Sequence, residues 1–169
     1  MRGLNQSTMR TGRLARTERG VQMVEMAICM PILLVLFAVA GEMGRLYFMN
    51  TTLAKGTRLA ARYLTTVPLN TSDNVTLYYG NAKNLVVYGK LAPTGNDTPI
   101  VPELTTGKVV ITATGGTSII PQFITVQVTG MTFTPVLSLG KLIKNPNFSL
   151  AVPLSPSTTM RYLITQPLN

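Results

Sequence analysis

Histidine is absent from the 169-residue sequence, and cysteine occurs once, as Cys29. Without histidine the chain can build neither a Ser-His-Asp triad nor a histidine metal site. Because Cys29 lies inside an apolar run, the rest of the chain has no thiol for a disulfide framework, and Cys29 is interpreted as a small apolar filler. The sequence therefore predicts no cofactor and no metal, and we expect a protein that is not an enzyme.

Charge is also scarce, at 12% of residues against 46% apolar residues, whereas soluble domains carry about 25% charged residues. The net charge of +9 is unevenly spread, because five of the fifteen cations fall in the first nineteen residues beside one acid, Glu18. Zinc-finger ligands and an RNP-like aromatic motif are both missing. This pattern favours membrane topology over a nucleic-acid surface, so we expect no nucleic-acid partner.

A long apolar run follows the basic leader of residues 1–20. Residues 21–41 read VQMVEMAICMPILLVLFAVAG and hold one charge, Glu25. About 20 apolar residues in a helix cross the hydrocarbon core of a membrane. The arginines before the run place the leader in the cytoplasm by the positive-inside tendency, although Arg45 and three further cations follow the run on its other side. The sequence predicts one transmembrane helix over residues 21–41 with the remaining chain outside the cytoplasm.

Glu25 is the unusual residue of this run, because an isolated carboxylate in lipid costs several kcal/mol and is retained only with a partner or a function. Gly20 closes the leader five residues before it. A cut after Gly20 would create an α-amine on Val21, one helical turn from Glu25. That amine could neutralise the carboxylate within one helix or, in an assembly, that of a neighbouring subunit.

The segment G-V-Q-M-V-E-M from Gly20 resembles the processing site of type IV prepilins. Further stretches resemble the TadE-like minor pseudopilins of tight-adherence pili: E-M-G-R-L-Y-F at 42–48, A-A-R-Y at 60–63, A-K-N-L-V-V-Y-G at 82–89, V-Q-V-T-G-M-T-F-T-P at 126–135 and T-T-M-R-Y at 158–162. The resemblance implies cleavage by a prepilin peptidase between Gly20 and Val21, and a role for Val21 and Glu25 in subunit assembly.

The same resemblance implies a single-pass protein of the bacterial inner membrane with a periplasmic C-terminal domain and a structural role in pilus assembly. Its expected partners are other pilins or pseudopilins, inner-membrane pilus assembly proteins, the prepilin peptidase and the lipid bilayer. Entry into the filament and a role restricted to priming its assembly are both compatible with this resemblance.

Two alternatives remain open on the residues alone. The chain could be an uncut bitopic scaffold of the cell envelope, in which Glu25 is a tolerated acid near the membrane interface. It could instead be a secreted binding module, because Ala38-Val39-Ala40 fits the A-x-A pattern of a signal peptide cleaved after Ala40.

Beyond the membrane run, residues 42–67 are expected to continue the helix with an amphipathic pattern, and Pro31 is a candidate kink within it. An apolar stripe at helical spacing faces away from three cations, Lys55, Arg58 and Arg62. Its members are Leu46, Met49, Leu53, Gly56, Ala60 and Tyr63 or Leu64. Val67-Pro68 disfavours further helix, so the stripe needs another element to cover it.

Residues 68–169 are predicted to form a small extracytoplasmic α+β domain with a pilin-like arrangement. Ser72 is a candidate cap of a second, short helix that ends near Gly89. A proline-rich loop then leads to a small antiparallel sheet, with strands expected at 108–114, 123–134 and 157–165, a turn at Gly115-Gly116 and a loop over 137–156. The fold class is thus α+β, with a long N-terminal helix, a second helix and a small sheet.

Overall fold

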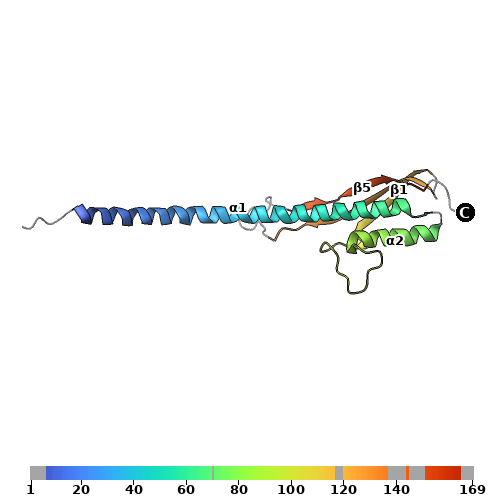
Figure 1. The fold of residues 1–169 in the computed structure, drawn as a ribbon, viewed down its shortest axis with the longest axis horizontal. Helices are drawn as coiled ribbons and strands as arrows, with labels where there is room; N and C mark the ends of the chain where they lie inside the picture. The colour runs from blue at the N-terminus through green and yellow to red at the C-terminus, as the bar shows by residue number, and fades with distance from the viewer. Residues whose placement is uncertain (1–6, 70, 117–119, 137–143, 145–150, 165–169) are drawn as a thin grey trace, which may run out of the picture. The chain divides into compact units, whose positions relative to one another are not determined.

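The computed structural model describes residues 7–69, 71–116, 120–136, 144 and 151–164, with side chains from Gly20 onward. Helices and small antiparallel sheets give the predicted α+β architecture (Figure 1). The chain divides into two compact units, Met1–Met43 and Gly44–Asn169. Helix α1 (Ser7–Thr66) contributes residues to both units.

Helix α1 begins earlier than the sequence predicted, at Ser7 and not near Val21. The part of the leader that the structure describes contains arginine and leucine, which have high helix propensity, and no proline. The first six residues of the predicted leader lie outside the described part of the chain. Pro31 lies inside α1, which continues through it.

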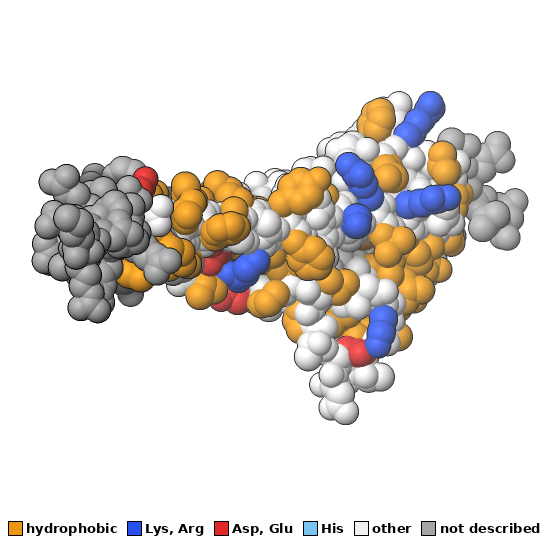
Figure 2. All heavy atoms as spheres, turned by 60° about the vertical axis from the view of Figure 1, so that its left-hand side comes forward, with side chains coloured by type: hydrophobic (Ala, Val, Ile, Leu, Met, Phe, Trp, Pro, Cys, Tyr) orange, Lys and Arg blue, Asp and Glu red, His pale blue; other side chains and the backbone are white. Residues whose placement is uncertain are grey.

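In the first unit, the apolar side chains of α1 are exposed around the helix. Leu34 and Phe37 show 64% and 75% of their surface, and apolar side chains cover the visible face of this segment (Figure 2). By length and hydropathy α1 is the one helix, among the described residues, that could cross a membrane. A helix that is apolar on all sides is stable in lipid or among other apolar helices, but not in water.

Helix α2 (Ser72–Tyr88) is bounded by two caps. Its N-cap is Thr71, whose Oγ1 accepts a hydrogen bond from the backbone N–H of Asn74, at 3.2 Å. The cap predicted at Ser72 is therefore wrong by one residue, because Thr71 holds the extended conformation that a cap requires and Ser72 is already helical. At the other end Gly89 adopts φ +70°, and its N–H donates to the carbonyl of Leu85.

A short 3-10 helix, η1 (Thr106–Lys108), leads into a three-stranded antiparallel sheet of order β1-β2-β5. Its strands are β1 (Val109–Gly116), β2 (Pro121–Val128) and β5 (Ser157–Arg161). Strand β1 extends beyond the predicted 108–114 to include Gly115 and Gly116, with Gly116 paired to Pro121.

A second, two-stranded sheet contradicts two of the predictions. It pairs β3 (Met131–Phe133) with β4 (Val152–Leu154). The single strand predicted over 123–134 is divided, because Gly130 adopts φ +67° and breaks the extended backbone between β2 and β3. Strand β4 lies within 137–156, which was predicted as loop; of that range only 144 and 151–156 are described. Strand β5 ends at Arg161, before the predicted end at 165, which is outside the described residues.

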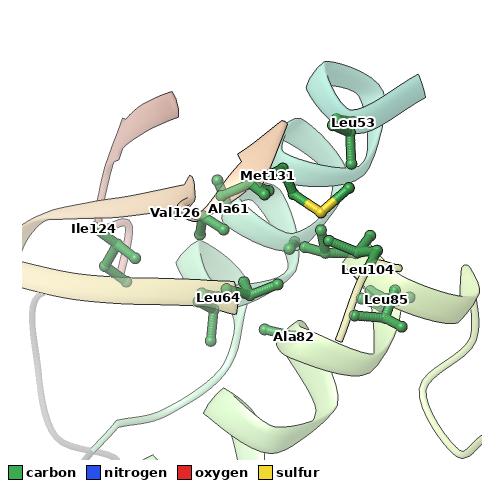
Figure 3. Packing of buried hydrophobic residues seen from close by; sticks show 14 of the residues in the cluster. Leu53, Ala61, Leu64, Ala82, Leu85, Leu104, Ile124, Val126 and Met131 are labelled. Carbon is green, nitrogen blue, oxygen red and sulfur yellow. The ribbon is translucent and has the colours of Figure 1, made fainter. Parts of the chain in front are cut away.

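The core of the second unit covers the apolar stripe of α1. Leu53, Ala60 and Leu64 are buried, as the helical spacing predicted, and α2 and the strands supply the facing residues (Figure 3). In β2 the buried positions alternate with exposed or half-buried ones through Ile124, Val126 and Val128. Each fully buried leucine or valine stabilises the fold by about 1.5–3 kcal/mol, so this stripe is a large part of the domain's stability.

Helix α1 contacts both α2 and β5. A Cβ built on Gly56 would lie 3.3 Å from the carbonyl oxygen of Val86, so the two helices approach closely there. On the strand side, the hydroxyls of Thr57 and Thr158 are 3.1 Å apart. The second half of α1 is thus enclosed between a helix and a sheet.

Candidate processing and assembly site

Gly20 lies inside α1, and its position is open. A Cβ built on it would meet nothing within 4 Å, so no part of the chain that the structure describes requires a glycine there. In a helix interior glycine costs about 1 kcal/mol relative to alanine. A local reason for glycine is therefore missing from the fold, and the helix is locally easy to open at this point.

Val21 and Glu25 lie one helical turn apart on the same face of α1, and both are exposed. Among the residues whose side chains are described, Glu25 takes part in no ion pair. Its neighbours along this face are apolar, with Ile28 63% exposed. The carboxylate therefore lies on an apolar helix surface with room for a cation from outside the described structure.

The cations predicted on the polar face of α1 lie in the second unit. Lys55, Arg58 and Arg62 are all exposed, opposite the buried stripe. Arg45 lies 5.5 Å from the centre of the buried Phe133 ring, in a cation–π arrangement.

Tyr162 joins the end of the sheet to the end of α1, a role that sequence reasoning missed. Its Oη donates to the carbonyl of Val67 at 2.8 Å and accepts from the N–H of Leu69 at 3.0 Å. The side chain is buried, and the backbone N–H of Leu163 reaches the carbonyl of Thr65. From sequence alone the one available signal was an aromatic residue with a polar hydroxyl within the last predicted strand.

Tyr162 also affects the pKa of a second tyrosine, Tyr79. Burial raises the pKa of Tyr79 above its ordinary value, and the proximity of Tyr162 raises it further. The Tyr79 hydroxyl is therefore neutral at physiological pH.

The loop after α2 is held by a surface carboxylate. Asp97 accepts hydrogen bonds from Lys90 Nζ at 2.6 Å and from the backbone N–H of Thr94 at 2.8 Å. The Lys90 hydrogen bond, followed by those from Thr94, lowers the pKa of Asp97 to about 2. The carboxylate is thus ionised at physiological pH and fixes the loop after α2 by its bonds to Lys90 and Thr94.

Groups of three or more metal-ligating side chains do not occur among the described residues. Cys29 is exposed on the apolar part of α1.

In a comparison with known proteins, the segment that carries Gly20, Val21 and Glu25 matches a protein family. Residues 20–62 match the sequence model of the TadE-like protein family. Neither a curated protein nor a solved structure matches the chain significantly. The match begins at Gly20 and covers the apolar and amphipathic parts of α1 up to Arg62. The resemblance of the later segments to that family stays a prediction. Over residues 20–62 the chain is therefore similar to the TadE-like family, as its sequence predicted.

Proposed function

We propose that this chain is a minor pilin or pseudopilin that acts as a structural component in assembling a tight-adherence pilus. The TadE-like family suggests a role in such assembly, and the apolar α1 fits a single-pass membrane anchor. A prepilin peptidase cuts after Gly20, the leader faces the cytoplasm, and the C-terminal domain lies in the periplasm. Its role is structural and not catalytic.

The observation that carries this proposal is Glu25, an exposed carboxylate on an apolar helix one turn from Val21. In lipid, this group requires a cation. Cleavage after Gly20 supplies one, the α-amine of Val21, either on the same helix or on a neighbouring subunit. Pairing between subunits sets the axial register of adjacent helices, which is what a helical assembly needs.

Gly20 supports the same proposal through its surroundings. Because nothing within 4 Å limits the side chain there, the fold does not account for the glycine. A peptidase that must unwind the helix and approach the backbone closely does account for it, since glycine favours both.

The experiment is N-terminal sequencing and intact-mass measurement of the protein extracted from membranes. We expect a mature chain that begins at Val21. A chain that begins at Gly41 supports the secreted module, and one that keeps Met1 supports the uncut scaffold; either result contradicts the proposal.

A matched pair of variants sharpens this test. Gly20→Leu should block cleavage, because the added side chain fills the space that the peptidase uses. Gly44→Leu is the control, since Gly44 also lies in α1 and is also open within 4 Å; it should be cleaved as wild type. Equal processing of the two variants would contradict recognition of Gly20.

A further inference from the structure

The exposed face of α1 in the second unit carries a straight line of cations. Lys55, Arg58 and Arg62 follow one another at steps of three and four residues, so they lie on one face of the helix. All three are exposed, and no ion pair or side-chain hydrogen bond joins them to the rest of the described structure. We call these three residues the basic ridge.

Among the described residues, no acid forms an ion pair with the basic ridge. From Gly44 onward the sequence holds ten cations and three acids, a net charge of +7. One of the acids, Asp97, is already paired with Lys90. Strand β5, which lies beside α1, has Arg161 as its charged residue. Figure 2 shows a face on which several basic side chains gather without acidic ones between them.

The close spacing of the three cations in the basic ridge destabilises α1. Like charges three and four residues apart destabilise a helix by tenths of a kcal/mol per pair. The C-terminal end of the helix dipole compensates cations only within the last turn of α1, and that turn contains none. The fold itself therefore gives no reason for three cations in this line.

We propose that the basic ridge docks an acidic α-helix of another protein subunit, whose carboxylates recur at steps of three and four residues. The ridge is straight and held on a rigid helix, so it matches charges that are themselves arranged along a helix. Leu59, which is 49% exposed and lies one helical turn from Lys55 and from Arg62, adds an apolar contact beside the charges. This interface is separate from the pairing of Glu25.

Other occupants fit less well. A second copy of this chain would set one basic ridge against another. A membrane-surface helix inserts its apolar face into lipid, but the apolar face of this part of α1 is covered by α2 and the strands, with Leu53, Ala60 and Leu64 buried.

The test uses the purified full chain in uncharged detergent micelles and a synthetic helical peptide with glutamates at positions i, i+3 and i+7. A control peptide of equal composition distributes its glutamates around the helix. Binding is measured by fluorescence anisotropy at low and high salt. We expect the patterned peptide to bind about tenfold more tightly at ~50 mM salt, and the preference to vanish near ~0.5 M, because exposed ion pairs are weak and screened.

Two double variants with equal loss of charge locate the binding. Arg58→Gln/Arg62→Gln should abolish the preference for the patterned peptide, whereas Lys83→Gln/Arg161→Gln, which changes cations on α2 and β5, should retain it. If both double variants lost the preference for the patterned peptide equally, the effect would be one of net charge alone, and the proposal would be overturned. Tighter binding to anionic lipid vesicles or to duplex DNA than to the patterned peptide would overturn it in favour of those partners.

Discussion

Glu25 combines features that are rarely found together, since it is exposed, charged and placed among apolar side chains that are themselves exposed. The carboxylate is stable in lipid only when a cation reaches it. Under the proposed function Val21 gains a charge only when cleavage releases its amine, so the proposal links cleavage and pairing through one residue. This link allows the pairing to be tested without disturbing the helix.

Glu25→Gln should leave membrane insertion and cleavage intact, because the amide has the same shape and is less costly to bury. It should impair co-assembly with other pilins, since the neutral amide cannot compensate a buried amine, a loss of roughly 3–5 kcal/mol for each broken pair. Crosslinking to other pilins and surface pilus counts measure the effect. Glu103→Gln, at an exposed acid outside α1, is the control. Wild-type assembly of the Glu25 variant would contradict the pairing.

A second single residue, Tyr162, stabilises the domain through the hydrogen bonds of its side chain. Tyr162→Phe removes the hydroxyl that bonds Val67 and Leu69 and leaves two backbone groups without that partner. We expect a loss of about 2–4 kcal/mol in the free energy of unfolding, measured by urea denaturation. Tyr47→Phe, at a side chain that is 72% exposed, should stay within about 0.5 kcal/mol of wild type. Equal stability of both variants would mean that the hydrogen bonds contribute nothing net.

At the scale of elements, a glycine in α1, Gly56, allows α1 and α2 to approach each other closely. Gly80→Ala in α2 should stabilise the domain by about 0.5–1 kcal/mol, because a Cβ there meets nothing within 4 Å and alanine favours the helix. Gly56→Ala has the same helical gain but places its Cβ 3.3 Å from the carbonyl oxygen and 3.4 Å from the Cα of Val86. The backbone of α2 would have to move, so we expect no stabilisation. Thermal unfolding of both variants measures this difference. An equal rise in the melting temperature of the two would contradict the close approach of α1 and α2.

The elements that sequence analysis found were those with a strong periodic signal. The spacing of Leu53, Ala60 and Leu64 predicted the buried face of α1, and alternation predicted β2. The break at Gly130 was missed because a glycine in a strand pattern does not reveal its φ angle. Strand β4 was missed because Pro153 is unusual in a strand, and it is tolerated in this two-stranded sheet.

The candidate site was predicted from sequence for a different reason, and its function stays a prediction. Gly20, Val21 and Glu25 are close in sequence, so helical geometry alone brings Val21 and Glu25 onto one face. Tyr162 contacts Val67 across 95 residues, and a contact of that range depends on the packing of the whole domain, which no local pattern encodes.

At the scale of the molecule, the domain needs the second half of α1. A fragment of residues 44–169 retains Leu53, Ala60, Ala61 and Leu64, which are all buried, and begins at the boundary of the second compact unit. A fragment of residues 69–169 lacks them and exposes their apolar partners. We expect cooperative unfolding of the first and little or none of the second, measured by circular dichroism during urea titration. Equal cooperativity would mean that the stripe of α1 is dispensable to the domain.

The bond from Tyr162 to the end of α1 has a consequence for the order of synthesis. Synthesis proceeds from the N-terminus, so the apolar stripe of α1 is made before β5, and Tyr162 is made 95 residues after Val67. Contacts of such long range form slowly because a long loop must close first. During that interval the nascent chain presents an uncovered helix to holdase chaperones and proteases. A nonsense mutation shortly before Tyr162 should therefore leave an unclosed product that quality-control proteolysis removes, although α1, α2 and strands β1 to β4 have been translated.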